Sequence, residues 1–276
     1  MAKHLELVPQ RSVSSFRKLA IGSWRTGHDP TVYGTLTVQV DGALGFLEAF
    51  RARTGLPLQL SHLVVRAVAE ALRRCPEANA VLRFNRIYLR QRVDVSLMVP
   101  SGEGLDADLV PVKLEGADGL GLGALVQGLE AAAARVREGG DAALERERRL
   151  LTHVPFVLLR PFSRLVALLQ HTLNLDLRAL GLPRDPFGSA AVVDVGALGV
   201  DTAYLPLVPH ARVPLVVALG AVRQVARVLP DGSVGVGRVV NVNASFDHRF
   251  IDGYHAAVLA RAVKELLEHP TDPSAA

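Results

Sequence analysis

The sequence predicts an α+β fold with a mixed, mostly antiparallel β-sheet covered by helices. Segments of alternating polarity and segments of helical spacing are interleaved along the chain, and several predicted strands are joined by tight turns. No shift in composition marks a linker. The 276 residues are 49% hydrophobic, which is enough to bury a large core. We therefore expect residues 1–276 to form a single domain.

The first half of the chain begins with a strand, because apolar and polar residues alternate over residues 35–41. A helix should follow, with Leu44, Leu47 and Phe50 on its buried face. A stronger helix is expected to begin at Ser61, as its N-cap, and to end before Pro76. Further alternation predicts one or two antiparallel strands, then a turn and another strand: 87–99, 100–102 and 109–114.

The second half repeats this mixture of helices and strands. Residues 121–137 have helical spacing and stop at the glycine pair 139–140, after which the charged residues 141–151 continue as a helix. Strands, a hairpin turn and a last helix follow in the order 189–195, 213–219, 230–233, 234–246 and 254–268.

The most apolar segment, residues 154–169, is not expected to cross a membrane. Two prolines and two arginines interrupt it, whereas a spanning helix needs about 20 mostly apolar residues. We interpret it as a helix pair in the core or at a subunit contact, within an atypical apolar insertion over residues 151–186. Contact with a membrane surface or a partner is the alternative.

Charge and cysteine content narrow the class of protein. The net charge of +4 is spread along the chain, which argues against nucleic-acid binding and is compatible with a polyanionic coenzyme. The single cysteine, Cys75, excludes a disulfide framework and a site with several thiolates. No signal peptide is evident, so we expect a cytoplasmic location.

The motif H-x-x-x-D-G, formed by His248, Asp252 and Gly253, joins the last predicted strand to the last helix. A histidine there can act as general base, because its ordinary pKa of about 6.5 lies near neutrality, and a thiol or hydroxyl would be its natural substrate group. Metal binding is disfavoured, since these residues have no third ligand at a suitable spacing, and we expect no metal. We expect Gly253 to let the backbone turn.

The longer string SFDHRFIDG, residues 245–253, resembles the signature of the acyltransferase component of the 2-oxoacid dehydrogenase complexes, whose catalytic domain is similar to chloramphenicol acetyltransferase. Three other strings resemble the opening helix, a central helix and the final helix of that family: RKLAIGSW, LSHLVVRAVAEALRRCPEANAVL and HAAVLARAVKELLEHP. The string VSLMVPSGEGLDADLVPVKLEGAD resembles its paired strands. The resemblance covers most of residues 12–270.

The resemblance implies a chloramphenicol acetyltransferase-like two-layer fold and a homotrimer with active sites between subunits, often assembled into a larger hollow core. An acyl group would move between coenzyme A and a dihydrolipoyl or other thiol. His248 would remove the thiol proton, and Asp252 would hold the histidine loop by pairing with Arg17. Gly253 would make the turn, and Ser245 would support the motif.

Two departures from the family pattern bear on activity. Val193 and Asp194 stand where the family has an oxyanion-binding serine or threonine and an asparagine. Loss of one such donor costs a factor of about 10²–10³ in rate, unless Ser189 or Thr202 substitutes. The second departure is the 151–186 insertion.

Neither a lipoyl domain nor a peripheral-subunit-binding domain is recognisable, so the lipoyl group would come from a separate carrier, and dehydrogenase components are possible partners. The alternatives are an inactive or weakly active scaffold of the same fold and an enzyme that acetylates a small hydroxylated compound.

Overall fold

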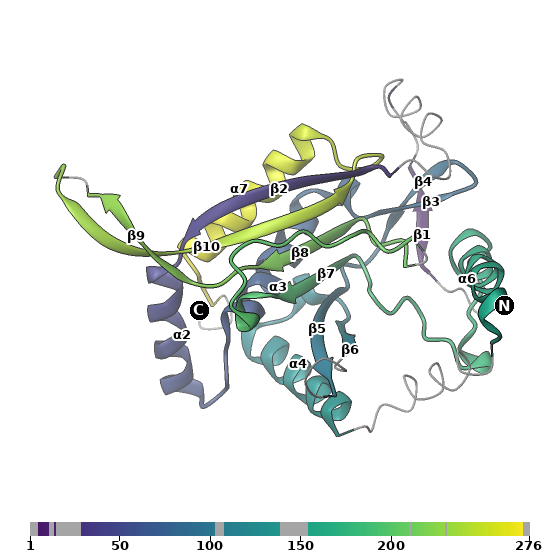
Figure 1. Ribbon diagram of the computed structural model, residues 1–276, viewed down its shortest axis with the longest axis horizontal. Coiled ribbons are helices and arrows are strands. Elements are labelled where there is room, and N and C mark those ends of the chain that lie inside the picture. Colours follow the sequence, from purple (N-terminus) through teal and green to yellow (C-terminus); the bar gives the residue numbers. More distant parts are fainter. Residues whose placement is uncertain are drawn as a thin grey trace.

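The computed structural model describes residues 5–10, 14, 29–102, 108–138, 154–209, 211–229 and 231–272. Arg17, the glycine pair 139–140 and the predicted helix 141–151 lie outside these ranges. Figure 1 shows a twisted sheet with the helices α3 and α7 behind it, a two-layer arrangement that confirms the predicted α+β class.

The main sheet has seven strands, in the order β2-β10-β8-β7-β5-β6, with β9 also paired to β10. Their bounds in chain order are β2 Thr31–Gln39, β5 Val95–Ser101, β6 Asp108–Leu114, β7 Ala190–Asp194, β8 Leu215–Leu219, β9 Arg223–Val228 and β10 Val234–Asp247. The pairs β5–β7 and β7–β8 are parallel, and the other pairs are antiparallel. The prediction of a mixed, mostly antiparallel sheet is therefore correct.

A smaller sheet consists of β1 (Leu7–Pro9), β4 (Arg86–Arg90) and β3 (Ala80–Arg83). The prediction of one or two antiparallel strands over residues 87–99 is confirmed, since β4 and β5 are two strands and each pairs antiparallel with a neighbour, although they belong to different sheets. The hairpin between β3 and β4 turns at Phe84 and Asn85, both of which have positive φ. Positive φ at both residues is the conformation of a two-residue hairpin loop. Phenylalanine is not a residue that this loop favours, so the turn could not be predicted from the sequence.

Four longer helices pack with the sheet: α2 Asp41–Thr54, α3 Leu60–Arg74, α4 Leu122–Arg137 and α7 Gly253–Glu268. The largest core cluster joins their apolar faces to one face of the sheet and includes Val38, Leu72, Leu125 and Leu267. The predicted Ser61 cap of α3 was wrong. Gln59 is the N-cap, and its side chain and that of His62 form a reciprocal capping box, while Ser61 lies buried inside the helix.

The other face of the sheet is covered by the described residues of the irregular segment 199–213, which are 199–209 and 211–213. Apolar side chains of this segment form two small clusters with residues of β7 and β8. This segment crosses the sheet closely at Gly220, where a Cβ would overlap the carbonyl oxygen of Asp201. A hydrogen bond from the backbone N–H of Ala221 to Val200 O, 3.0 Å long, holds the crossing in place.

The apolar insertion contains the short helices η4 Phe156–Leu158, α6 Leu159–Ala167, η5 Leu168–Thr172 and η6 Arg178–Leu180. It docks on the small sheet through a buried ion pair between Arg90 and Asp185 and through a hydrogen bond from Arg83 Nε to Thr172 O, 3.0 Å long. The predicted location of this helix pair in the core was wrong, since Val157 and Leu165 are exposed in the single chain. The alternative location, at a subunit contact, stays a prediction. None of the helices in the described ranges is long and apolar enough to span a membrane.

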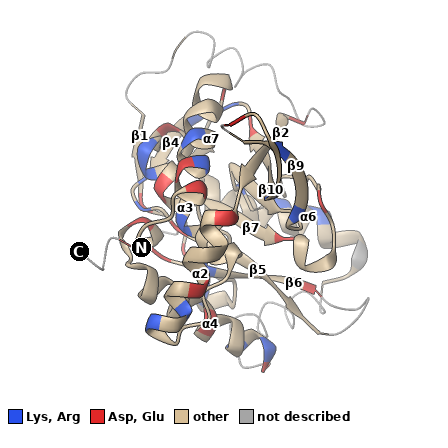
Figure 2. Cartoon of the chain, turned by 90° about the vertical axis from the view of Figure 1, so that its left-hand side faces the viewer, with Lys and Arg blue, Asp and Glu red and all other residues tan. Residues whose placement is uncertain are grey.

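The described part of the chain also includes three single-turn helices, η1 Pro76–Ala78, η3 Ala117–Gly119 and η7 Gly196–Leu198. Charged residues of both signs are interspersed over the helical side of the molecule that Figure 2 shows.

Candidate active site

His248 lies immediately after β10, in the turn that leads to α7. Its backbone N–H donates to Pro30 O at 2.9 Å, and its Nδ1 lies 3.0 Å from the carbonyl oxygen of Ile251. Because a carbonyl only accepts, this contact places the proton of the neutral ring on Nδ1. Nε2 then carries the lone pair, which is the state a general base requires. The side chain is half-buried, so the ring combines a fixed orientation with access from outside.

Asp252 is the N-cap of α7. Its Oδ1 accepts hydrogen bonds from the backbone N–H groups of Tyr254 and His255, at 3.0 and 3.1 Å, and also lies 2.5 Å from His255 Nδ1. The carboxylate therefore fixes where the helix begins, directly after the loop that carries His248. Its expected partner Arg17 lies outside the described residues.

Gly253 does not make a turn that requires glycine. It is the first residue of α7, it is not among the residues with positive φ, and a Cβ at this position would meet nothing within 4 Å. The direction of the chain changes in residues 248–252 instead, so the predicted role of Gly253 was wrong within this chain.

Asp247 and Arg249 flank the histidine, and sequence reasoning assigned neither a role. The buried Asp247 carboxylate accepts two hydrogen bonds from the Arg249 guanidinium, from Nε at 2.9 Å and Nη2 at 2.6 Å. Arg212 lies near this pair, and burial, together with the positive charge of Arg249, lowers its pKa from the ordinary value. The pairing fixes the backbone on both sides of His248. Its only sequence signal was the D-H-R order inside the motif string.

Ser245 is buried, with 1% of its surface exposed, and its hydroxyl makes no hydrogen bond within the described part of the chain. It lies on the polar side of β10, which faces away from helices α3 and α7. On this side Thr35 and Thr37 of β2 donate to Asn243 and Asn241 at 2.9 Å. Ser245 therefore follows Asn241 and Asn243 in a row of polar side chains along β10 that leads toward the histidine loop. It does not contact a catalytic group.

Val193 lies far from His248 within one chain. Strand register places it in a row that crosses the sheet through Ala218 of β8 and Asn243 of β10. Asn243 precedes His248 by about 17 Å of strand, and two strand spacings add about 10 Å sideways, which gives a separation of roughly 20 Å. Val193 is buried in an apolar cluster with Val195 and Ala218. Within one chain, a group at this position is therefore too far from His248 to contact the same substrate atom.

Asp194 follows Val193 at the end of β7 and is the residue that the resemblance predicts in place of the family's asparagine. Its Oδ1 accepts a hydrogen bond from the backbone N–H of Ala197, in the short helix η7, at 3.0 Å. Burial raises the pKa of this carboxyl group, although the bond from Ala197 opposes the shift. Asp194 therefore has a local structural function at the end of β7.

The two alternative oxyanion donors differ in availability. Ser189 is completely buried; its Oγ accepts from the backbone N–H of Asp94 at 3.1 Å and donates to Arg92 O at 3.3 Å, which argues against a role in binding substrate. Thr202 is exposed, and its Oγ1 accepts from Asn241 Nδ2 at 3.0 Å. This bond orients the hydroxyl but does not use its proton, so Thr202 retains the chemistry of a donor.

An apolar cavity of about 160 Å³ lies between the sheet and helices α3 and α7. It is lined by side chains of β10 and α7, including Val242, Phe246 and Leu259, and none of the described residues that line it is charged. Strand β10, which leads directly to His248, thus has a polar side toward segment 199–213 and an apolar side toward helices α3 and α7.

Comparison with known proteins gives the family context of this site. The model of the family described as 2-oxoacid dehydrogenases acyltransferase (catalytic domain) matches residues 21–146 and 187–274. The unmatched stretch between them coincides closely with the predicted insertion.

Two curated proteins illustrate the similarity. The lipoamide acyltransferase component of the branched-chain alpha-keto acid dehydrogenase complex of Pseudomonas putida is 40% identical over 82 residues, which are 29% of this chain and 18% of that protein. The dihydrolipoyllysine-residue acetyltransferase component of the pyruvate dehydrogenase complex of Zymomonas mobilis is 23% identical over 244 residues, 87% of this chain and 45% of that protein. The chain thus spans about half the length of its curated relatives, or less.

Solved structures agree on the fold. A probable dihydrolipoamide acetyltransferase from Listeria monocytogenes has a TM-score of 0.65 and 15% identity, over 98% of both chains. The cubic core of a pyruvate dehydrogenase multienzyme complex has a TM-score of 0.63 and 17% identity, over 95% of this chain and 97% of that one. The described sheet and helices therefore have the architecture of acyltransferase cores.

Proposed function

Because the chain belongs to the 2-oxoacid dehydrogenases acyltransferase (catalytic domain) family, we propose that it transfers an acyl group between coenzyme A and a dihydrolipoyl-type thiol. The single observation that carries this proposal is the orientation of His248, which lies half-buried in the turn before α7 with its Nδ1 3.0 Å from Ile251 O.

In the proposed reaction, His248 Nε2 removes the proton of the acceptor thiol, and the thiolate attacks the thioester carbonyl carbon. A new carbon–sulfur bond forms, and the carbonyl oxygen carries the negative charge of the tetrahedral intermediate. When the old carbon–sulfur bond breaks, the leaving thiolate takes the proton back from Nε2. Asp252 contributes by fixing the end of the histidine loop at the start of α7.

We further propose that the active site forms between copies of the chain in a homotrimer. The support is the separation of roughly 20 Å between Val193 and His248 within one chain, which excludes a shared substrate carbonyl there. Thr202 is held by Asn241, which lies still farther from His248 along β10, so it too could serve only the histidine of another copy. A larger hollow assembly and contacts with dehydrogenase components are proposed by analogy with the relatives.

The test is a panel of acyl-CoA donors with dihydrolipoamide, other thiols and small alcohols as acceptors. We expect thioester exchange by the wild-type chain and a loss of at least 10²-fold in His248→Ala. A Ser14→Ala variant, changed outside the motif, is the matched control and should retain the wild-type rate. Equal residual rates in wild type and His248→Ala would contradict the catalytic proposal.

A second candidate function is a scaffold that keeps the fold while catalysis is weak or lost. The observation that favours it is the apolar burial of Val193, the residue that the resemblance predicts at the position of the family's oxyanion donor. The same panel separates the alternatives, since a scaffold would show no turnover that depends on His248. Acetylation of a small hydroxylated compound would appear as activity with alcohols only.

A further inference from the structure

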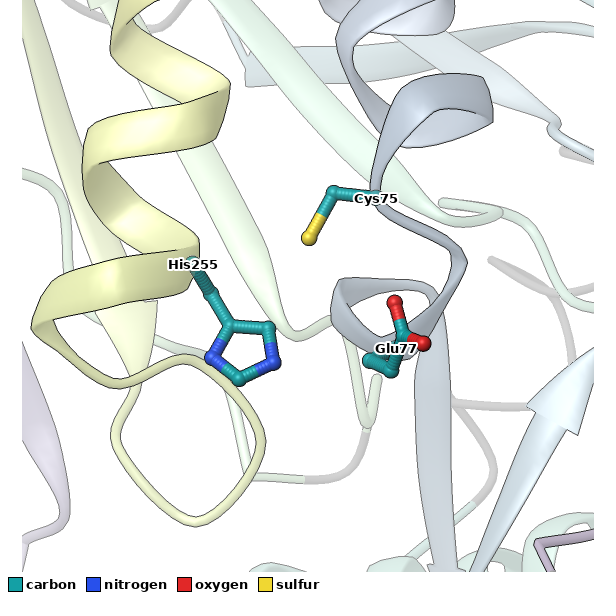
Figure 3. A group of neighbouring side chains, drawn as sticks. All are labelled: Cys75, Glu77 and His255. Carbon is teal, nitrogen blue, oxygen red and sulfur yellow. The ribbon is translucent and has the colours of Figure 1, made fainter.

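Three metal-binding side chains from distant parts of the sequence meet beside the motif (Figure 3). Cys75 is the C-cap residue of α3, Glu77 lies in η1, and His255 lies in the first turn of α7. One ligating atom of each residue lies within 4.8 Å of those of the other two. Figure 3 shows the three groups directed into the space between the end of α3 and the beginning of α7.

The contact with Asp252 orients His255 for metal binding. Its Nδ1 lies 2.5 Å from Asp252 Oδ1, and a carboxylate only accepts, so Nδ1 carries the proton. Nε2 therefore presents its lone pair toward the space shared with Cys75 and Glu77. A carboxylate behind the distal nitrogen is the usual support of a metal-binding histidine, because it fixes the tautomer and raises the basicity of the ligating nitrogen.

The ligand types select the metal. A thiolate, an imidazole and a carboxylate are the combination that zinc accepts, whereas magnesium and calcium prefer oxygen ligands. Tetrahedral zinc holds its ligand atoms about 3.5 Å apart, so the three groups must approach one another by about 1 Å. Glu77 is exposed and can make this movement, while Cys75 is buried and the His255 side chain is only 17% exposed.

The charge around the cluster suits a divalent cation. The thiolate and the Glu77 carboxylate would supply two negative charges, with the Asp252 carboxylate behind the imidazole. The nearest arginine in the sequence, Arg74, directs its guanidinium to Glu70 and Glu265 at 2.9 and 2.7 Å, which engages its positive charge elsewhere.

We propose that Cys75, Glu77 and His255 bind one zinc ion, with the fourth position open to water or an exogenous ligand. The ion would join the end of α3 to the beginning of α7. Through His255 it would also hold Asp252, and hence the end of the loop that carries His248. Zinc binding can be measured independently of the proposed acyl transfer, because no step of that reaction uses the three ligands.

Cobalt and zinc titrations of the full chain test the site. Since Cys75 is the single cysteine, a thiolate–cobalt charge-transfer band can come only from this residue. We expect one equivalent of cobalt to produce the band, one equivalent of zinc to abolish it, and zinc to raise the Tm. Cys75→Ser and His255→Gln should weaken zinc binding at least 10²-fold, and Glu77→Gln about tenfold. His269→Gln, an exposed change at the other end of α7, is the matched control and should bind zinc as the wild type does.

Absence of the thiolate–cobalt band in the wild type would overturn the proposal. Full zinc affinity in Cys75→Ser or Glu77→Gln would also overturn it, because the ion would then be bound elsewhere. Glu77→Gln keeps the test decisive if a buried variant folds poorly, since Glu77 is exposed. Failure of the acyl-transfer assay would leave this binding result unaffected.

Discussion

Acidification from pH 7.5 to pH 5 should destabilise the fold through His62. Burial lowers the pKa of this side chain to about 4, with a smaller contribution from the positive charge of Arg51. Gln59 N–H donates to its Nδ1 at 3.3 Å, so Nε2 carries the proton of the neutral ring and faces Glu130 Oε1 at 3.5 Å. The imidazole is therefore held in the neutral state inside the capping box of α3.

The sign follows from proton uptake. The unfolded chain protonates this histidine below about pH 6.5, whereas the folded chain does so only below about pH 4. Between these values the unfolded state binds more protons, so stability falls as the pH falls. Between the two pKa values the free energy of unfolding changes by about 3 kcal/mol in total. Acidification from pH 7.5 to pH 5 lowers the free energy of unfolding by about 2 kcal/mol.

Urea unfolding followed by far-ultraviolet circular dichroism at several pH values measures this effect. His62→Gln should remove most of the loss, because glutamine can accept from Gln59 and does not titrate; His269→Gln is the exposed control. Glu70 interferes little, since Arg73 and Arg74 lower its pKa to about 2 and its contribution is lost only between about pH 4.5 and pH 2. Equal slopes of stability against pH in wild type and His62→Gln would refute the reasoning.

Three further outcomes are expected from the packing. Asp185→Ala leaves the buried Arg90 guanidinium unpaired and should lower the free energy of unfolding, measured with urea, by about 3–5 kcal/mol. A loss below about 1 kcal/mol would contradict the ion pair. Gly220→Ala forces a Cβ into the carbonyl of Asp201 and should lower stability by about 2 kcal/mol or more; an unchanged midpoint would show that the crossing is loose. Val193→Ser buries a hydroxyl in an apolar cluster and should lower the free energy of unfolding by about 1–3 kcal/mol. If a missing oxyanion donor limits the rate, the same change should raise the rate of acyl transfer at least tenfold, and an unchanged rate would contradict that explanation.

Much of the fold could be predicted from local patterns. The alternation around Val38 and Val40 correctly identified the buried side of β2, and helical spacing located α2, α3, α4 and α7. Side-chain periodicity is set by backbone geometry over a few residues, so it can be read directly from the chain. The motif likewise placed His248 between β10 and α7, because strand, turn and helix signals are all local.

Tertiary structure decided the partners of these elements and the environment of each candidate residue. The assignment of β4 to a separate sheet, the complete burial of Ser189 and the distance of Val193 from His248 all depend on pairings between distant segments. The approach of Cys75 to His255 has the same origin, since α3 and α7 pack side by side. Local sequence determined which residues face the core, because burial follows the period of the strand or helix. Packing alone determined which polar groups meet, because contacts between distant segments have no short-range period.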